Sequence, residues 1–132
     1  MPRGYNQSET SVHFMGYCFV WCPKYGKKVL TGKVEERLKQ LINAKAKTMG
    51  CEILALEIMP DHVHLFIQGN PIMTPNKLIG SIKGFTSHEL RQEFKELRTR
   101  LPTLWSRSYF VSTHGHVSEA TIRRYIDEQR GM

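Results

Sequence analysis

The pattern of apolar and polar positions predicts alternating strands and helices along the first half of the chain. Nearly every residue of 11–22 is apolar or aromatic, as is typical of a strand buried on both faces of a sheet. Over residues 32–49 the apolar positions recur at helical spacing, which predicts an amphipathic helix. Two apolar runs at 51–58 and 62–68 flank the turn Pro60-Asp61 and predict a β-hairpin.

The second half predicts a helix, a short strand and a final helix. Apolar residues at helical spacing extend over 75–97, although Gly80 and Gly84 weaken the early turns. A short strand is predicted at 108–113. The last helix is predicted at 118–129, with Ser118 as its N-cap.

The element order βαββαβα predicts the fold class. Two helices that cross between strands of one antiparallel sheet give an α+β sandwich of the ferredoxin-like or RRM-like type, with both helices on one face and the other face open. The final helix has no position assigned by this pattern. We expect a single domain over residues 1–132, with its core at about 11–113 and the final helix at about 118–130.

Composition and charge narrow the function. Nineteen Lys and Arg against twelve Asp and Glu give a net charge of +7, which favours a polyanionic partner such as nucleic acid. The longest apolar run, 14–22, is too short to span a membrane, and the first ten residues hold no apolar signal core. We therefore expect no membrane association and a cytoplasmic location. The three cysteines form no CxxC pair and are interpreted as reduced core residues.

Two histidines open the predicted strand at 62–68. Side chains alternate along a strand, so His62 and His64 share the face opposite Val63 and Leu65. Their spacing of about 6.6 Å along the strand lets two imidazoles converge on one metal ion. The same pair could also face solvent or hydrogen-bond across the sheet, and the pattern alone leaves both interpretations open.

The final helix offers further candidate groups. Tyr125 and Gln129 stand four residues apart and share a helix face with Ile122 and Ile126. If this face packs on the sheet, the phenol and the amide approach the histidines. From spacing alone, a tyrosine between two isoleucines is more often an interface residue than a nucleophile.

Taken together, these motifs resemble a known family. The stretches 21-WCPKYGKKVL-30, PDHVHL at 60–65 and 101-LPTLW-105, with Tyr-x-x-x-Gln in the terminal helix, are similar to the single-tyrosine HUH transposases of insertion sequences, the TnpA type. The resemblance covers almost the whole chain. Gly26 is a departure, because a basic residue is expected there.

The resemblance implies a mechanism and a set of partners. It makes His62 and His64 metal ligands, Gln129 the third ligand and Tyr125 the nucleophile, with Mg²⁺ or Mn²⁺ as the cofactor. Members of the family are homodimers in which the tyrosine helix of one subunit can complete the histidine site of the other. They cleave and rejoin single-stranded DNA at hairpin transposon ends through a 5′-phosphotyrosine intermediate.

Several basic residues are candidates for contacts with DNA phosphates, although each alone could be a solvated surface charge. These candidates are Lys24, Lys27, Lys28, Lys77, Lys83 and Arg91. In 114-HGHV-117, Gly115 could act as a hinge for the final helix, or it could be an ordinary loop glycine. The second His-x-His pair, in the same segment, is a weaker metal candidate because glycine fixes no common direction.

Three alternatives remain from the sequence. One is a non-catalytic module that binds single-stranded nucleic acid on an open sheet. Another is a related HUH nickase that acts on host repeats. A third, a metal-dependent hydrolase, would leave no protein attached to DNA.

Overall fold

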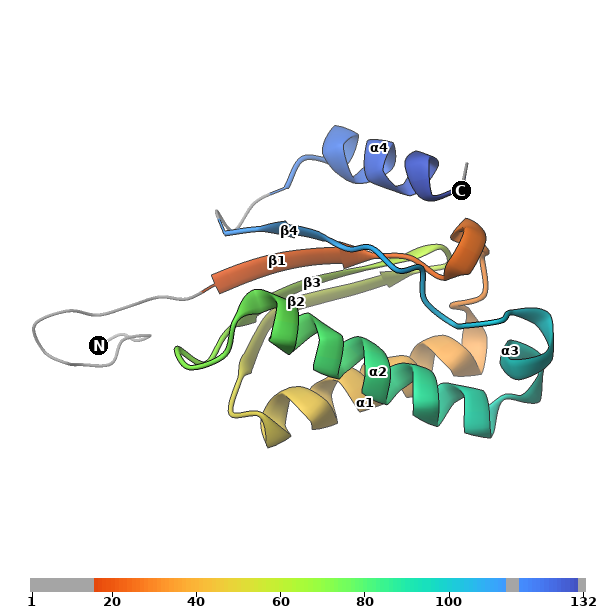
Figure 1. Cartoon of the computed structure of the whole chain (residues 1–132), viewed down its shortest axis with the longest axis horizontal. Helices are drawn as coiled ribbons and strands as arrows, with labels where there is room; N and C mark the ends of the chain where they lie inside the picture. The colour runs from red at the N-terminus through yellow and green to blue at the C-terminus, as the bar shows by residue number, and fades with distance from the viewer. Residues whose placement is uncertain (1–15, 114–116, 131–132) are drawn as a thin grey trace, which may run out of the picture.

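The computed structural model describes residues 16–113 and 117–130. It confirms the predicted α+β sandwich: four antiparallel strands in the order β2-β3-β1-β4 form one sheet, with α1 and α2 against one face (Figure 1). No helix in these two ranges is long and apolar enough to cross a membrane. The elements are β1 (Gly16–Trp21), η1 (Lys24–Gly26), α1 (Gly32–Thr48), β2 (Glu52–Met59), β3 (His62–Gln68), α2 (Pro75–Glu93), α3 (Lys95–Arg100), β4 (Phe110–Ser112) and α4 (Glu119–Arg130).

The core lies between the sheet and the two long helices. All six residues of β1 are buried, because this strand lies inside the sheet between β3 and β4. Its side chains Phe19 and Trp21 are fully buried among those of α1 and α2. A buried Phe side chain such as Phe19 stabilises the fold by about 1.5–3 kcal/mol relative to the exposed state.

The alternation predicted for β3 is confirmed. Val63 and Leu65 are fully buried in the core, so His62 and His64 project from the opposite face of the sheet. His64 pairs with Val20 of β1 and with Glu57 of β2. Residues paired directly across antiparallel strands share a face, and Glu57 therefore lies beside His64.

The helix predicted over 75–97 is wrong at its end. Phe94 adopts extended angles (φ −121°, ψ 101°) and separates α2 from α3. Phe94 packs on the core, and the change of direction returns Leu97 and Leu101 to the core as well. Arg91 stabilises the corner, because its Nη1 donates to the Leu101 carbonyl at 3.0 Å.

The last strand is shorter than predicted, because β4 comprises only Phe110–Ser112. The final helix begins as expected: the backbone N–H of Thr121 donates to the Ser118 hydroxyl at 3.1 Å. Residues 11–15 of the first predicted strand, and Gly115 with both neighbouring histidines, lie outside the described residues.

The sheet face that was expected to be open carries α4. Figure 1 shows α4 over the β4 side of the sheet, opposite α1 and α2. Ile126 is fully buried and Gln129 is 7% exposed, so the apolar stripe of α4 packs on the sheet. The helix that holds the candidate tyrosine thus shares a sheet face with the two histidines.

Candidate active site

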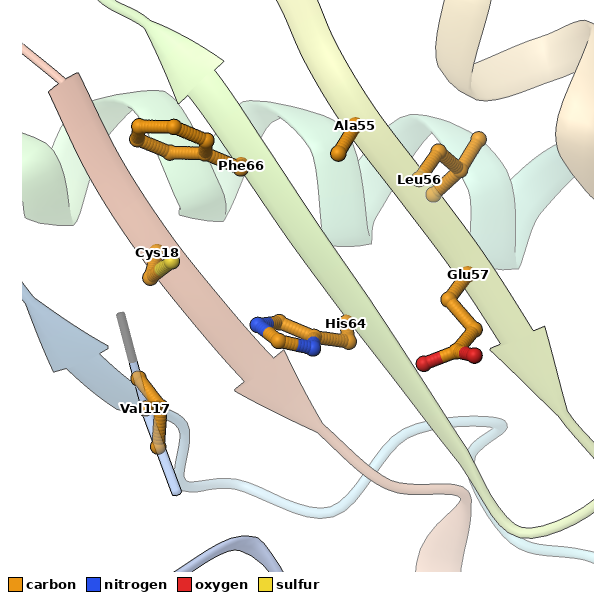
Figure 2. Close-up of a pocket in the computed structure, with 7 residues that line it drawn as sticks. All are labelled: Cys18, Ala55, Leu56, Glu57, His64, Phe66 and Val117. Atoms are coloured by element: carbon orange, nitrogen blue, oxygen red, sulfur yellow. The ribbon is translucent and has the colours of Figure 1, made fainter. Parts of the chain in front are cut away.

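The two histidines line one pocket on the face that α4 covers. Its volume is about 580 Å³, and β2 contributes Glu57 and Met59 to its wall. From α4, Ile122 and Arg123 close the other side. Figure 2 shows His64 beside Glu57 on the neighbouring strand, in an adjoining pocket.

A hydrogen bond orients the first histidine. His62 Nδ1 lies 2.9 Å from Asp61 Oδ1, and both residues are more than nine-tenths buried. Burial raises the pKa of the Asp61 carboxyl, but the hydrogen bond to His62 and the charges of Arg130 and Arg123 hold that pKa below its ordinary value. Asp61 is therefore an anion at neutral pH. It accepts the Nδ1 proton of His62, which makes Nε2 the ring nitrogen that can bind a metal.

The donor set fits a divalent cation but is incomplete. Two imidazoles on one strand face can supply nitrogen ligands. Among the described residues no group of three or more His, Cys, Asp or Glu side chains gathers in metal-binding geometry. Within the described ranges, a third protein ligand would therefore be of another kind, such as the amide oxygen of Gln129, and residues outside these ranges or another chain could also supply one. Phosphate oxygens of a bound substrate could fill further positions.

Tyr125 and Gln129 meet at one serine. Ser108 Oγ lies 2.9 Å from the Tyr125 hydroxyl and 2.9 Å from Gln129 Oε1. Because an amide oxygen only accepts, the Ser108 hydroxyl donates to Gln129 and accepts from Tyr125. Burial raises the pKa of Tyr125, against the lowering effect of the Ser108 hydrogen bond. In this arrangement the phenol is neutral, and it donates its own proton.

The structure holds these two pairs of residues apart. Ser108 belongs to the segment that leads into β4, and β1 lies between β4 and β3. Two interstrand spacings, about 10 Å, therefore separate the backbone of β4 from that of β3, which carries the histidines. Gln129 lines a different pocket from the histidines. The α4 residues that line the pocket of the imidazoles are Glu119, Ala120, Ile122 and Arg123.

Comparison with known proteins identifies the family of this chain. The family model "Transposase IS200 like" matches residues 11–129. The chain belongs to the IS200-like transposase family. The resemblance inferred from the sequence is therefore confirmed, and the protein is a transposase that acts on DNA.

Two individual transposases are similar to this chain in sequence. This transposase is 32% identical to the ISDra2 transposase TnpA of Deinococcus radiodurans over 131 residues, which cover 98% of this chain and 94% of the relative. It is 28% identical to the IS200 transposase of Salmonella typhimurium, over 86% of this chain and 75% of the relative.

Solved structures share the fold. A crystal structure of a proposed transposase from Deinococcus radiodurans R1 matches with a TM-score of 0.82 and 31% identity, over 94% of this chain and 97% of that one. A REP-associated tyrosine transposase bound to a REP hairpin matches with a TM-score of 0.55 and 16% identity, over 96% of this chain and 67% of that one. The second likeness concerns the fold alone.

Three residues around the site of this transposase were missed by the sequence analysis. Ser108 precedes a short strand and carries no distinguishing pattern. Asp61 was interpreted only as a turn residue. Arg130 on α4 forms an ion pair with Asp61, a contact between residues 69 positions apart that no local pattern reveals.

The same contact explains the departure at Gly26. This residue has φ +64°, and a Cβ placed on it would collide with Cγ of Arg130. The left-handed backbone and the missing side chain both favour glycine. Arg130 thus places a basic side chain over the position where the resemblance led us to expect one.

The basic residues predicted to contact DNA differ in their exposure and in the groups they bind. Lys27, Lys28 and Lys77 are exposed, whereas Lys24 is half-buried. Lys83 is half-buried too, and its Nζ donates to the carbonyls of Ser106 and Ser108 at 2.9 and 3.0 Å. Like Arg91 at the α2–α3 corner, Lys83 holds backbone in place, while the exposed lysines remain candidates for contacts with DNA phosphates.

Lys83→Met is expected to lower the free energy of unfolding by about 1–3 kcal/mol, because two carbonyls lose their donor. Burial lowers the pKa of Lys83 from 10.5 to about 8. Between these values the folded wild type binds fewer protons than the unfolded chain, so its stability rises with pH. The stability of the Lys83→Met variant does not rise with pH in this way, because the variant has no amine at this position. Urea denaturation at pH 7.5 and pH 9.5 should therefore show a larger deficit at the higher pH.

Lys77→Met, on the same helix and exposed, is the matched control and should change stability by less than about 0.5 kcal/mol at both pH values. Equal losses from the two substitutions would contradict the role of Lys83 in holding the Ser108 segment.

Proposed function

We propose that this transposase cleaves and rejoins single-stranded DNA with Tyr125 as nucleophile, while His62, His64 and Gln129 hold Mg²⁺ or Mn²⁺. The observation that carries the proposal is the shared sheet face: α4 presents Tyr125 and Gln129 on the side from which the histidines project. Membership of the transposase family supplies a DNA substrate for this chemistry.

The proposed step exchanges one phosphoester for another. The Tyr125 hydroxyl gives its proton to solvent as its oxygen attacks the scissile phosphorus, the bond to the 3′ oxygen breaks, and that oxygen takes up a proton from solvent to become a free 3′-OH. The phosphate remains on the tyrosine, so a later 3′-OH can attack it and rejoin a strand without an external energy source. When bound, the divalent cation supplies charge neutralisation at the phosphate and at the departing oxygen.

The arrangement around Ser108 corresponds to a resting state in this proposal. There the phenol donates to Ser108, and burial keeps its pKa above the ordinary value. Gln129 Oε1 is occupied by the same serine. Tyr125 and Gln129 must leave Ser108 before they can serve a phosphate at the histidines.

We further propose a homodimer in which α4 of one subunit serves the histidine site of the other. The strand order supports this, because β1 lies between β4, beside which Tyr125 is held, and β3, which carries the histidines. A tyrosine helix from a second subunit could reach β3 without crossing β1 of the first. The same geometry also permits a shift of α4 within one subunit, so the subunit arrangement requires its own experiment.

The proposed DNA partner is a single strand with hairpin ends. Shape recognition of such a hairpin needs phosphate contacts, and the exposed Lys27, Lys28 and Lys77 are candidates for them. A structural neighbour that is bound to a REP hairpin supports the choice of a hairpin as the recognised feature.

The decisive experiment is capture of the covalent intermediate. A single strand that carries the sequence flanking the gene, chosen for its predicted hairpins, is labelled at its 3′ end and incubated with protein and Mg²⁺. We expect a labelled band that resists SDS and has the mass of protein plus DNA, because the 5′ phosphate of the downstream fragment stays on Tyr125.

Two controls separate the alternatives. The same strand labelled at its 5′ end should release a free fragment with no adduct, and EDTA should remove both products. Cleavage of the 3′-labelled strand without any adduct would indicate a hydrolase and contradict the proposal. Binding without cleavage in Mg²⁺ and in Mn²⁺ would indicate a non-catalytic module.

A further inference from the structure

One carboxylate joins the histidine pocket to the tyrosine helix. Asp61 Oδ1 faces His62 Nδ1 at 2.9 Å, while Asp61 Oδ2 forms an ion pair with Arg130 of α4. A second cation of α4, Arg123, lies with its Nη1 3.9 Å from the same Oδ2. The Asp61 side chain is only 9% exposed, so its charge is screened mainly by these partners.

Features of the backbone hold both residues of the Asp61–Arg130 ion pair in place. Arg130 passes over Gly26, where a Cβ would collide with its side chain. Asp61 is fixed in turn by the hairpin, because the Leu30 N–H donates to the carbonyl of the neighbouring Pro60 at 3.0 Å. Both ends of the ion pair are therefore held in place.

The two roles of Asp61 compete electrostatically. A carboxylate that accepts the Nδ1 proton makes His62 Nε2 a more basic and better oriented ligand. A guanidinium on the same carboxylate withdraws part of that effect. Arg130 and Arg123 also add positive charge beside a pocket proposed to hold a dication, whereas Glu57 of β2 and Glu119 of α4 supply opposing negative charge in its lining.

We propose that Asp61 is a positioning residue that couples docking of the tyrosine helix to cation binding at the histidines, with opposite preferences. Docked Arg130 weakens cation binding, and a bound cation weakens the docking of Arg130, since coupling between two binding events is reciprocal. The inference rests on the proposed function, because it requires His62 and His64 to be metal ligands. It gives the resting α4 a release signal that precedes chemistry.

The test measures Mn²⁺ affinity of the full chain by isothermal titration calorimetry without DNA. Arg130→Gln is expected to bind Mn²⁺ at least about fivefold more tightly than the wild type. Asp61→Asn is expected to bind it about 10- to 100-fold more weakly, as for other residues that orient a ligand. In the Asp61→Asn background, adding Arg130→Gln should tighten Mn²⁺ binding by a clearly smaller factor than in the wild type, because only the direct charge effect of Arg130 remains once the shared carboxylate is gone. An equal factor in both backgrounds would refute the coupling through Asp61.

Arg124→Gln is the matched control, since it removes the same charge from the exposed side of the same helix. If Arg124→Gln tightens Mn²⁺ binding as much as Arg130→Gln does, the effect is general charge and the coupling is refuted. An unchanged affinity in Arg130→Gln refutes it as well. If the wild type shows no Mn²⁺ binding that His64→Ala removes, the metal site of the proposed function fails too, so the two failures are distinguishable.

Hydrogen–deuterium exchange gives the reciprocal readout. Mn²⁺ should speed amide exchange in the last turn of α4 in the wild type and leave Asp61→Asn unaffected, because that variant has already lost the ion pair. Slower exchange of this turn upon addition of Mn²⁺ would overturn the proposed sign of the coupling.

Discussion

Tyr125→Phe is expected to reduce covalent adduct and cleaved strand by at least about a thousandfold, because the phenol oxygen is the proposed nucleophile. The substitution keeps the aromatic ring, whose centroid lies 6.4 Å from that of Phe110. It removes the hydrogen bond to Ser108, which is worth about 1 kcal/mol. The fold and hairpin binding should therefore persist, as measured by circular dichroism and by gel shift on the same labelled strand.

Ser108→Ala is the control that separates chemistry from packing. It removes the same hydrogen bond as Tyr125→Phe and also releases Gln129 Oε1, yet it leaves the phenol in place. We expect this variant to retain adduct formation. Normal nicking by Tyr125→Phe would show that another group attacks the phosphate, and loss of adduct in both variants would assign the effect to the position of α4.

Most of the fold follows from local patterns. An unbroken apolar run marks β1 because an interior strand is covered on both faces, and alternation in β3 separates the core residues from the histidines. The prediction for the end of α2 is wrong because the helical spacing of apolar residues continues through Leu97. The break at Phe94 depends instead on how Leu97 and Leu101 pack in the core. Periodicity records which face is buried, but not where the chain changes direction.

The same distinction between local patterns and long-range contacts applies to the site. The two histidines and the Tyr125–Gln129 pair lie within single elements, so spacing could place each pair on one face. The bonds to Ser108 and the ion pair between Asp61 and Arg130 join elements that are distant in the sequence. They depend on how α4 lies on the sheet. The amphipathic stripe of α4 predicts that it packs, but it does not select the partner surface.

In the proposed dimer this partner surface could belong to either subunit, and a heterodimer distinguishes the two arrangements. His64→Ala and Tyr125→Phe chains are given different tags, co-expressed and purified through both tags. If α4 serves the other subunit, each heterodimer combines the intact histidines of one chain with the intact tyrosine of the other. One of two symmetric sites is then complete, and adduct formation should reach about half of the wild-type level. Each homodimer alone should be inactive.

The alternative arrangement predicts the opposite result. If α4 serves the histidines of its own chain, both sites of the heterodimer contain one damaged residue and no adduct should form. Failure of the two tagged chains to co-purify would contradict the dimer itself. A heterodimer of wild type with the His64→Ala/Tyr125→Phe double variant has one intact chain, so it retains activity only when a site is complete within a chain. Opposite outcomes for these two heterodimers would therefore show whether Tyr125, once it leaves Ser108, reaches the histidines of its own chain or those of the other chain.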